Sequence, residues 1–116
     1  MKKFFKRLAK YVVVAYAKRM YRKAVSMAEK RHDKEKTTIY VISSFTDPSQ
    51  LVTCNRSEFR KMKQRLGIQK HYIQHLKSGS WYHTSDAIGN NSLPLKDQVA
   101  RRIAFIRMVV KRAKLN

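Results

Sequence analysis

The stretch TTIYVISSFTDPSQLVTC, residues 37–54, decides the fold. It is rich in β-branched and aromatic residues, which favour strands. Residues 37–55 contain no Lys or Arg, although the whole chain holds 27 of them against 7 acidic residues. The TDPS sequence at 46–49 is typical of a turn. We therefore predict strands over 37–45 and 51–54, joined as a hairpin that forms the buried centre of the domain.

A long helix is predicted on the N-terminal side of this hairpin. Residues 3–34 carry apolar side chains at three- and four-residue steps, and neither Gly nor Pro interrupts them. Its apolar stripe includes Val12, Tyr16, Met20 and Ala24. We expect this stripe to pack on the hairpin around Tyr40 and Ile42.

A helical pair is predicted on the C-terminal side of the hairpin. The sequence Asn55-Arg-Ser-Glu58 is typical of a capping box at a helix start. In this motif the side chains of Asn55 and Glu58 each accept a hydrogen bond from the backbone N–H of the other residue. This helix should end near Leu66, because Gly67 readily adopts the left-handed conformation. We predict that residues 68–77 form the second helix of the pair.

A short strand over 81–84 and a last helix over 94–114 complete the chain. Ser92 and Pro94 stand where an N-cap and an early helical residue are expected. The predicted buried stripe of this helix is Leu95, Val99, Ile103, Ile106, Val110 and Ala113. The order of elements predicts a single basic α+β domain over 1–116, which is an ordinary domain length.

The formal net charge of +20 indicates an anionic partner. Residues 1–36 hold 13 basic residues, and 56–77 and 96–114 hold seven each, so the charge lies on the predicted helices. A merely soluble surface mixes charges of both signs, whereas unbalanced charge opposes compactness through self-repulsion. Nucleic acid is therefore the expected partner, DNA and RNA being equally compatible with the sequence.

The predicted phosphate and base contacts lie on all three basic segments. They are Lys3, Lys6, Arg7, Lys10, Arg60, Lys63, Lys70, His71, Gln74, Lys77, Arg101 and Arg102. Apolar residues around Gly67 follow the pattern of a helix-turn-helix that would present Lys70 and Gln74 to a groove. Lys63 occupies a position where that motif normally has a small residue, so a plain core-forming helical pair is favoured. Tyr72, Trp81 and Tyr82 are candidates for stacking on unpaired bases.

The sequence gives little sign of catalysis or of a cofactor. The seven carboxylates are scattered, and the chain has no glycine-rich phosphate loop and no nucleophile elbow. His71 and His75 share a helical face, but with Cys54 and His83 they match no standard zinc spacing. We therefore expect no enzyme, no metal and no cofactor. The single cysteine forms no intramolecular disulfide and fits a reducing compartment.

The N-terminal segment raises the question of a membrane. The apolar run over 11–17 is too short to span a bilayer, which takes about 20 residues. A basic amphipathic helix carrying Phe4, Phe5 and Leu8 is also of the type that lies on anionic membranes. Membrane binding is nevertheless disfavoured, because the apolar stripe of this helix is needed to cover the hairpin.

Four segments together resemble small basic orphan proteins of tailed phages and prophages of gut bacteria. They are Tyr16-Ala-Lys-Arg19, Phe59-Arg-Lys-Met62, Trp81-Tyr-His-Thr84 and the last helix with Arg101-Arg102. The resemblance implies a phage product and carries no catalytic residue with it. We therefore expect a non-enzymatic nucleic-acid-binding protein of the host cytoplasm or the virion. The alternative is a structural virion protein, of the head or connector, whose basic face meets packaged DNA or acidic neighbouring proteins.

Overall fold

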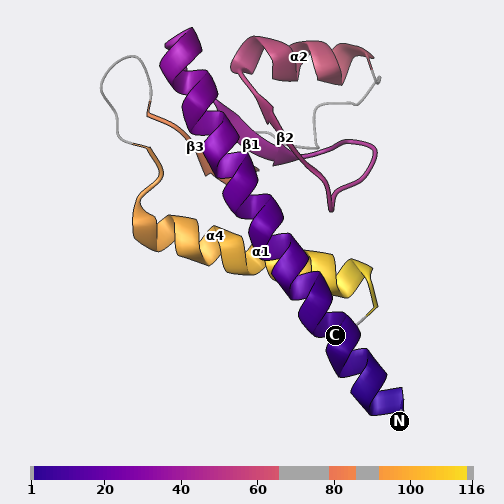
Figure 1. The fold of residues 1–116 in the computed structure, drawn as a ribbon. Coiled ribbons are helices and arrows are strands. Elements are labelled where there is room, and N and C mark those ends of the chain that lie inside the picture. Colours follow the sequence, from indigo (N-terminus) through magenta and orange to yellow (C-terminus); the bar gives the residue numbers. More distant parts are fainter. Residues whose placement is uncertain (1, 66–78, 86–91, 115–116) are drawn as a thin grey trace.

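The computed structural model describes residues 2–65, 79–85 and 92–114. Its elements in chain order are helix α1 (Lys2–Glu35), strands β1 (Tyr40–Ser43) and β2 (Leu51–Cys54), helix α2 (Arg56–Arg65), strand β3 (Tyr82–His83) and helix α4 (Leu95–Arg112). The predicted α+β fold is confirmed: a long N-terminal helix, a three-stranded antiparallel sheet, a short helix and a long C-terminal helix (Figure 1). The second helix of the predicted pair, over 68–77, lies outside the described residues.

The hairpin predicted from residues 37–54 forms two neighbouring strands of the sheet. Strand β1 lies in the centre, in the order β2-β1-β3, with Tyr40 opposite Cys54 on one side and His83 on the other. The Asp47 carboxylate fixes the turn, since it accepts hydrogen bonds from the backbone N–H and the hydroxyl of Ser49 at 3.1 and 2.7 Å. The local turn chemistry thus sets the register of the hairpin.

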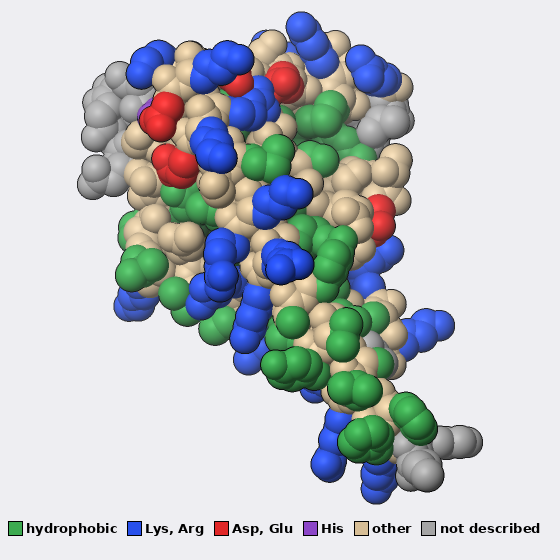
Figure 2. Space-filling model, viewed as in Figure 1, with side chains coloured by type: hydrophobic (Ala, Val, Ile, Leu, Met, Phe, Trp, Pro, Cys, Tyr) green, Lys and Arg blue, Asp and Glu red, His purple; other side chains and the backbone are tan. Residues whose placement is uncertain are grey.

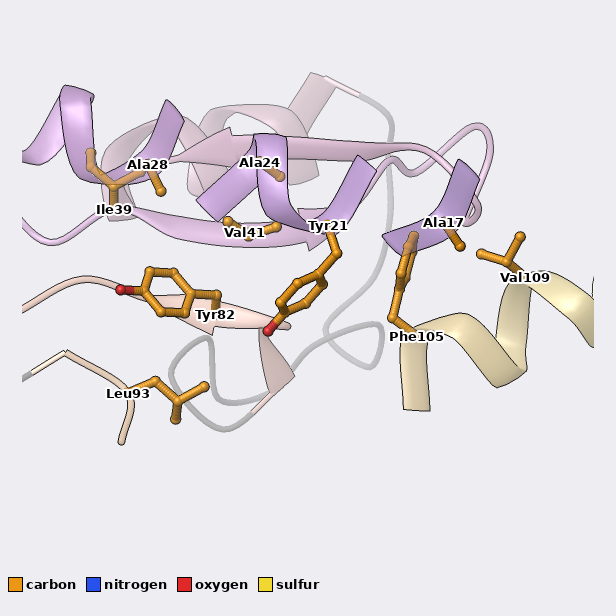
Figure 3. Close-up of a cluster of buried hydrophobic side chains, with 10 residues drawn as sticks. All are labelled: Ala17, Tyr21, Ala24, Ala28, Ile39, Val41, Tyr82, Leu93, Phe105 and Val109. Carbon is orange, nitrogen blue, oxygen red and sulfur yellow. The ribbon is translucent and has the colours of Figure 1, made fainter. Parts of the chain in front are cut away.

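The two faces of the sheet are covered by different helices. Side chains alternate along a strand, so Ile39 and Val41 point to one face while Tyr40 and Ile42 point to the other. On the first face the core joins the sheet to α1 and α4, through Ala17, Tyr21, Ala24, Ala28, Ile39, Val41, Tyr82, Leu93, Phe105 and Val109 (Figure 3). On the second face α2 contributes Phe59, which packs with Tyr40, Ile42 and Cys54.

Helix α2 begins with the capping box that the sequence predicts. The Glu58 N–H donates to Asn55 Oδ1 at 2.8 Å, and the Asn55 N–H donates to Glu58 Oε1 at 2.9 Å. Two backbone donors at the helix start are satisfied in this way.

Helix α4 departs from the N-cap prediction, because Pro94 occupies its N-cap position and provides no side-chain hydrogen bond.

The predicted packing of α1 was wrong in two respects. Ala24 is buried and Met20 is partly packed against the core, as predicted, but Val12 and Tyr16 are exposed. The residues buried on α1 are the row of Ala17, Tyr21, Ala24 and Ala28. That row covers Ile39 and Val41, whereas Tyr40 and Ile42 face α2. Small alanines bring the helix close to the sheet, and Tyr21 fills the space between the sheet and α4 (Figure 3).

The predicted stripe of α4 was also wrong in part. Val110 is buried and Val99 and Ile106 are half-buried, but Leu95, Ile103 and Ala113 are exposed. The Phe105 ring determines which side faces the core, because it packs on Tyr21 at 6.1 Å and on Trp81 at 5.4 Å between ring centroids. A large ring buries more apolar area than Ile103 or Leu95 would, so it takes the central position.

Candidate nucleic-acid interface

The polarity of α1 reverses along its length. Residues 3–12 are all exposed, and Figure 1 shows this N-terminal part projecting past α4 and away from the sheet. We call residues 3–12 the arm. Seven-residue steps return to nearly the same side of a helix, so Lys3 and Lys10 continue the row of the buried Ala17 and Ala24. The side of α1 that is apolar in the core is therefore basic in the arm.

The opposite side of α1 shows the reverse change. Phe4 and Tyr11 in the arm lie at seven-residue steps from Lys18, so an apolar row continues into a basic one. Four exposed cations occupy this side over two helical turns: Lys18, Arg19, Arg22 and Lys23. We call these four residues the cationic face. Figure 2 shows the same change on the surface, with Lys and Arg over the middle of α1 and hydrophobic side chains on its projecting end.

No acidic side chain that the structure describes forms an ion pair with the cationic face. No acidic residue occurs before Glu29, and Glu29 accepts a short hydrogen bond from the Tyr82 hydroxyl. Among the described residues, the ion pairs found both involve Arg31, which contacts Glu35 at 2.6 Å and Glu58 at 2.7 Å. Hydrogen bonding to Arg31 lowers the pKa of the Glu35 carboxyl. These carboxylates are thus engaged away from Lys18 to Lys23.

A groove lies beside the cationic face, between α1 and the start of β2. Its volume is about 310 Å³, and its lining includes Met20, Ala24 and Leu51. Arg19 and Lys23 lie along it, together with Tyr16, whose side chain is 54% exposed. An exposed ring beside two cations is the arrangement that proteins use to stack a base while holding the adjacent phosphates.

The sequence-predicted site residues fall into separate groups. Lys3, Lys6, Arg7 and Lys10 lie together on the basic side of the arm, where they line a common recess. Arg60 and Lys63 belong to α2, on the face of the sheet opposite α1. Lys63 is half-buried and places its ammonium 5.4 Å from the Phe59 ring centroid, a cation–π distance. The structure therefore brings the arm cations together and separates them from those of α2.

Arg101 and Arg102 are half-buried on α4. Arg101 donates a hydrogen bond to the Ser80 carbonyl at 2.7 Å, and so links α4 to the segment before β3. Burial raises the pKa of the Tyr21 hydroxyl to about 12. The positive charges of Arg101 and Arg102, which lie nearby, partly oppose this effect. Lys70, His71, Gln74 and Lys77, and with them the reading helix of the possible helix-turn-helix, lie outside the described residues.

Two of the aromatic residues considered for base stacking belong to the core. Tyr82 is buried, and Trp81 packs on Phe105 while its indole N–H donates to Ser43 Oγ at 2.9 Å.

Burial raises the pKa of the Cys54 thiol to about 12, so this thiol stays protonated at neutral pH and packs as an apolar group. Within residues 2–65, 79–85 and 92–114, no three His, Cys, Asp or Glu side chains gather as metal ligands. Tyr72, His71 and His75 lie outside these ranges.

The cationic face was not among the predicted site residues. Its signal is present in the sequence, since Lys18, Arg19, Arg22 and Lys23 lie on one side of a helix whose other side carries Ala17, Tyr21 and Ala24. It was missed because a single stripe was sought over residues 3–34. Dividing the segment near Tyr16 would have revealed two stripes on opposite sides.

No family model, curated protein or solved structure matches this chain. In the part of the chain that the structure describes, no helix is both long and apolar enough to cross a membrane.

Proposed function

We propose that this protein binds nucleic acid through the cationic face of α1. The observation that carries the proposal is the set of four exposed cations, Lys18, Arg19, Arg22 and Lys23. Two of them, Arg19 and Lys23, line the groove together with Tyr16. Phosphates are the natural partners of such a surface, because binding them releases condensed counterions. No catalytic step is assigned to the protein.

The position of the cationic face suits a long, charged ligand. The sheet and α4 hold the other side of α1, so the helix presents these cations on a supported and outward-facing surface (Figures 1 and 2). An α-helix fits the major groove of duplex DNA, while the ring of Tyr16 offers a stacking platform for an unpaired base. The arm cations lie on the opposite side of α1 and extend the charge beyond the domain.

Glutamine substitution of all four cations tests the proposal. The variant carries Lys18→Gln, Arg19→Gln, Arg22→Gln and Lys23→Gln, and its affinity for a labelled duplex and a labelled single strand is measured by fluorescence anisotropy across salt concentrations. Each lost phosphate contact should reduce the slope of log affinity against log salt by about one on a duplex. We therefore expect a slope that is shallower by roughly three to four, with much weaker binding at low salt.

A second variant of equal charge serves as the control. Helix α4 carries four exposed cations, Lys96, Arg107, Lys111 and Arg112, and their replacement by Gln removes the same charge. We expect this variant to keep most of the affinity and of the salt slope. Equal losses in both variants would show that binding follows net charge alone, and the assignment to α1 would then be wrong.

A further inference from the structure

Five exposed apolar residues on the arm have no covering element among the described residues. They are Phe4, Phe5, Leu8, Tyr11 and Val12, and their exposed fractions range from 51% at Leu8 to 73% at Tyr11. Phe4 and Phe5 contact each other edge to face at 5.8 Å between ring centroids. Monomeric proteins rarely leave aromatic side chains gathered in this way unless the surface binds something.

We infer that the arm lies on an anionic lipid bilayer, with these five side chains inserted between the headgroups. A helix of this type carries Phe and Leu on one side and Lys on the other, and it rests in the plane of the interface. The arm has this composition, since Lys3, Lys6 and Lys10 occupy the side opposite the apolar residues. These three lysines point to water when the apolar side enters the lipid.

The direction of the apolar side makes this contact possible. The sheet and α4 pack on the side of α1 that holds Ala17, Tyr21 and Ala24, and the apolar side of the arm faces away from them. An extended flat surface can therefore lie along the outer side of α1 without meeting the sheet or α4. Figure 2 shows hydrophobic side chains gathered on the projecting end of the molecule.

The charge of the neighbouring turns specifies the kind of lipid. Lys18 and Arg22 continue the side of the helix on which Phe4, Leu8 and Tyr11 lie. When α1 lies flat on a bilayer, these cations come next to the headgroups, where acidic phospholipids attract them. A bilayer and nucleic acid would meet the same side of α1, so the two ligands should compete.

A second copy of the chain fits this surface less well. Phe4, Leu8, Tyr11 and Ala15 follow coiled-coil spacing, but the next positions of that seam are Lys18 and Arg22. Two parallel arms would thus meet cation against cation after two heptads. Each copy also carries a formal charge of +20, which opposes self-association and favours an acidic surface.

Vesicle binding by the full chain tests the inference. The probes are vesicles of equal parts phosphatidylcholine and phosphatidylglycerol, vesicles of phosphatidylcholine alone, and the labelled duplex. The arm variant carries Phe4→Gln, Leu8→Gln and Tyr11→Gln, which keep helix propensity while removing the apolar side. A matched variant, Leu95→Gln with Ile103→Gln, removes exposed apolar side chains from α4.

We expect the wild-type chain to sediment with the anionic vesicles and the arm variant to partition at least about tenfold more weakly. The α4 variant should partition as the wild type does, and both variants should bind the duplex normally. Equal vesicle binding by the arm variant and the wild type would overturn the inference, since adsorption would then need only charge. Equal binding to neutral vesicles would overturn the assignment to acidic lipid. A wild-type dimer that becomes a monomer in the arm variant would assign the surface to a second copy instead.

Discussion

The two halves of α1 form one continuous helix, yet they differ in how far they are buried. Residues 17–28 are held by tertiary contacts, with Ala17, Tyr21, Ala24 and Ala28 buried against the sheet and α4. Residues 3–12 contribute no side chain to this core, and all of them are exposed. Helix formation alone therefore reveals little about which side of a helix is buried. That depends on where the neighbouring elements lie, and in the described part of the chain the sheet and α4 pack on the inner half of α1.

The difference also separates stability from binding. In the inner half, removing a side chain removes core packing, because the buried residues pack against the sheet and α4. In the arm, removing a side chain changes only what the surface offers to a partner. Mutations in one helix should thus fall into two classes, and the boundary should lie near Val13, which is the first residue partly packed against the core.

Among single substitutions, the largest expected effect comes from replacing a tyrosine by alanine on each of the two sides of α1. Tyr21 is 1% exposed, packs on Phe105 and donates a hydrogen bond to the Trp81 carbonyl at 2.6 Å. Tyr21→Ala should reduce the free energy of unfolding by about 3–5 kcal/mol, a large part of what a domain of this size has. Tyr16→Ala should change it by less than about 0.5 kcal/mol. Urea unfolding measures both, and equal losses would show that Tyr16 belongs to the core.

A smaller effect is expected from removing the arm. Deletion of residues 1–11 takes away no buried side chain of the described core, so the free energy of unfolding should stay within about 1 kcal/mol of the wild type. Deletion of residues 1–20 also removes Ala17, Val13 and Met20 from the core, and should abolish the cooperative transition. If the shorter deletion alone unfolds the protein, the arm is part of the fold and not a projection.

The sequence predicted the elements well and their packing less well. The hairpin, its turn at Asp47 and the Asn55–Glu58 capping box depend on local chemistry, and the structure confirms each of them. The side of α1 that is buried depends on where α4 crosses it, which local periodicity does not encode. Val12 and Tyr16 look as apolar as Tyr21 in the sequence, and the tertiary contacts of Tyr21 with Phe105 and Trp81 distinguish it from them.

The same limit applies to the candidate site. Counting cations identified the helices that carry charge, but it did not separate Arg101, which bonds to Ser80, from Lys18 or Arg22, which point outward. That distinction depends on the tertiary structure, which determines which cations are bonded to the protein itself. Arg31 is a further example, because its guanidinium pairs with both Glu35 and Glu58, and Glu58 is 27 residues away in the chain.

The smallest expected effect concerns pH and again distinguishes the two halves of α1. The hydrogen bond from Arg31 lowers the pKa of the Glu35 carboxyl. At Glu58, burial raises the pKa, but the hydrogen bonds from Arg31 and from the Asn55 N–H outweigh burial, so the pKa of Glu58 is lowered as well. Groups with lowered pKa values stabilise the fold above their ordinary pKa of 4.5, and this stability is lost as the pH falls through the lower, folded values. Arg31→Ala should therefore lower the melting temperature slightly at neutral pH and weaken its decline in acid. Lys10→Ala, in the arm, should leave the whole pH profile unchanged. Melting temperatures from pH about 7 to about 3 measure this, and an unaltered acid decline in Arg31→Ala would show that other carboxylates cause it.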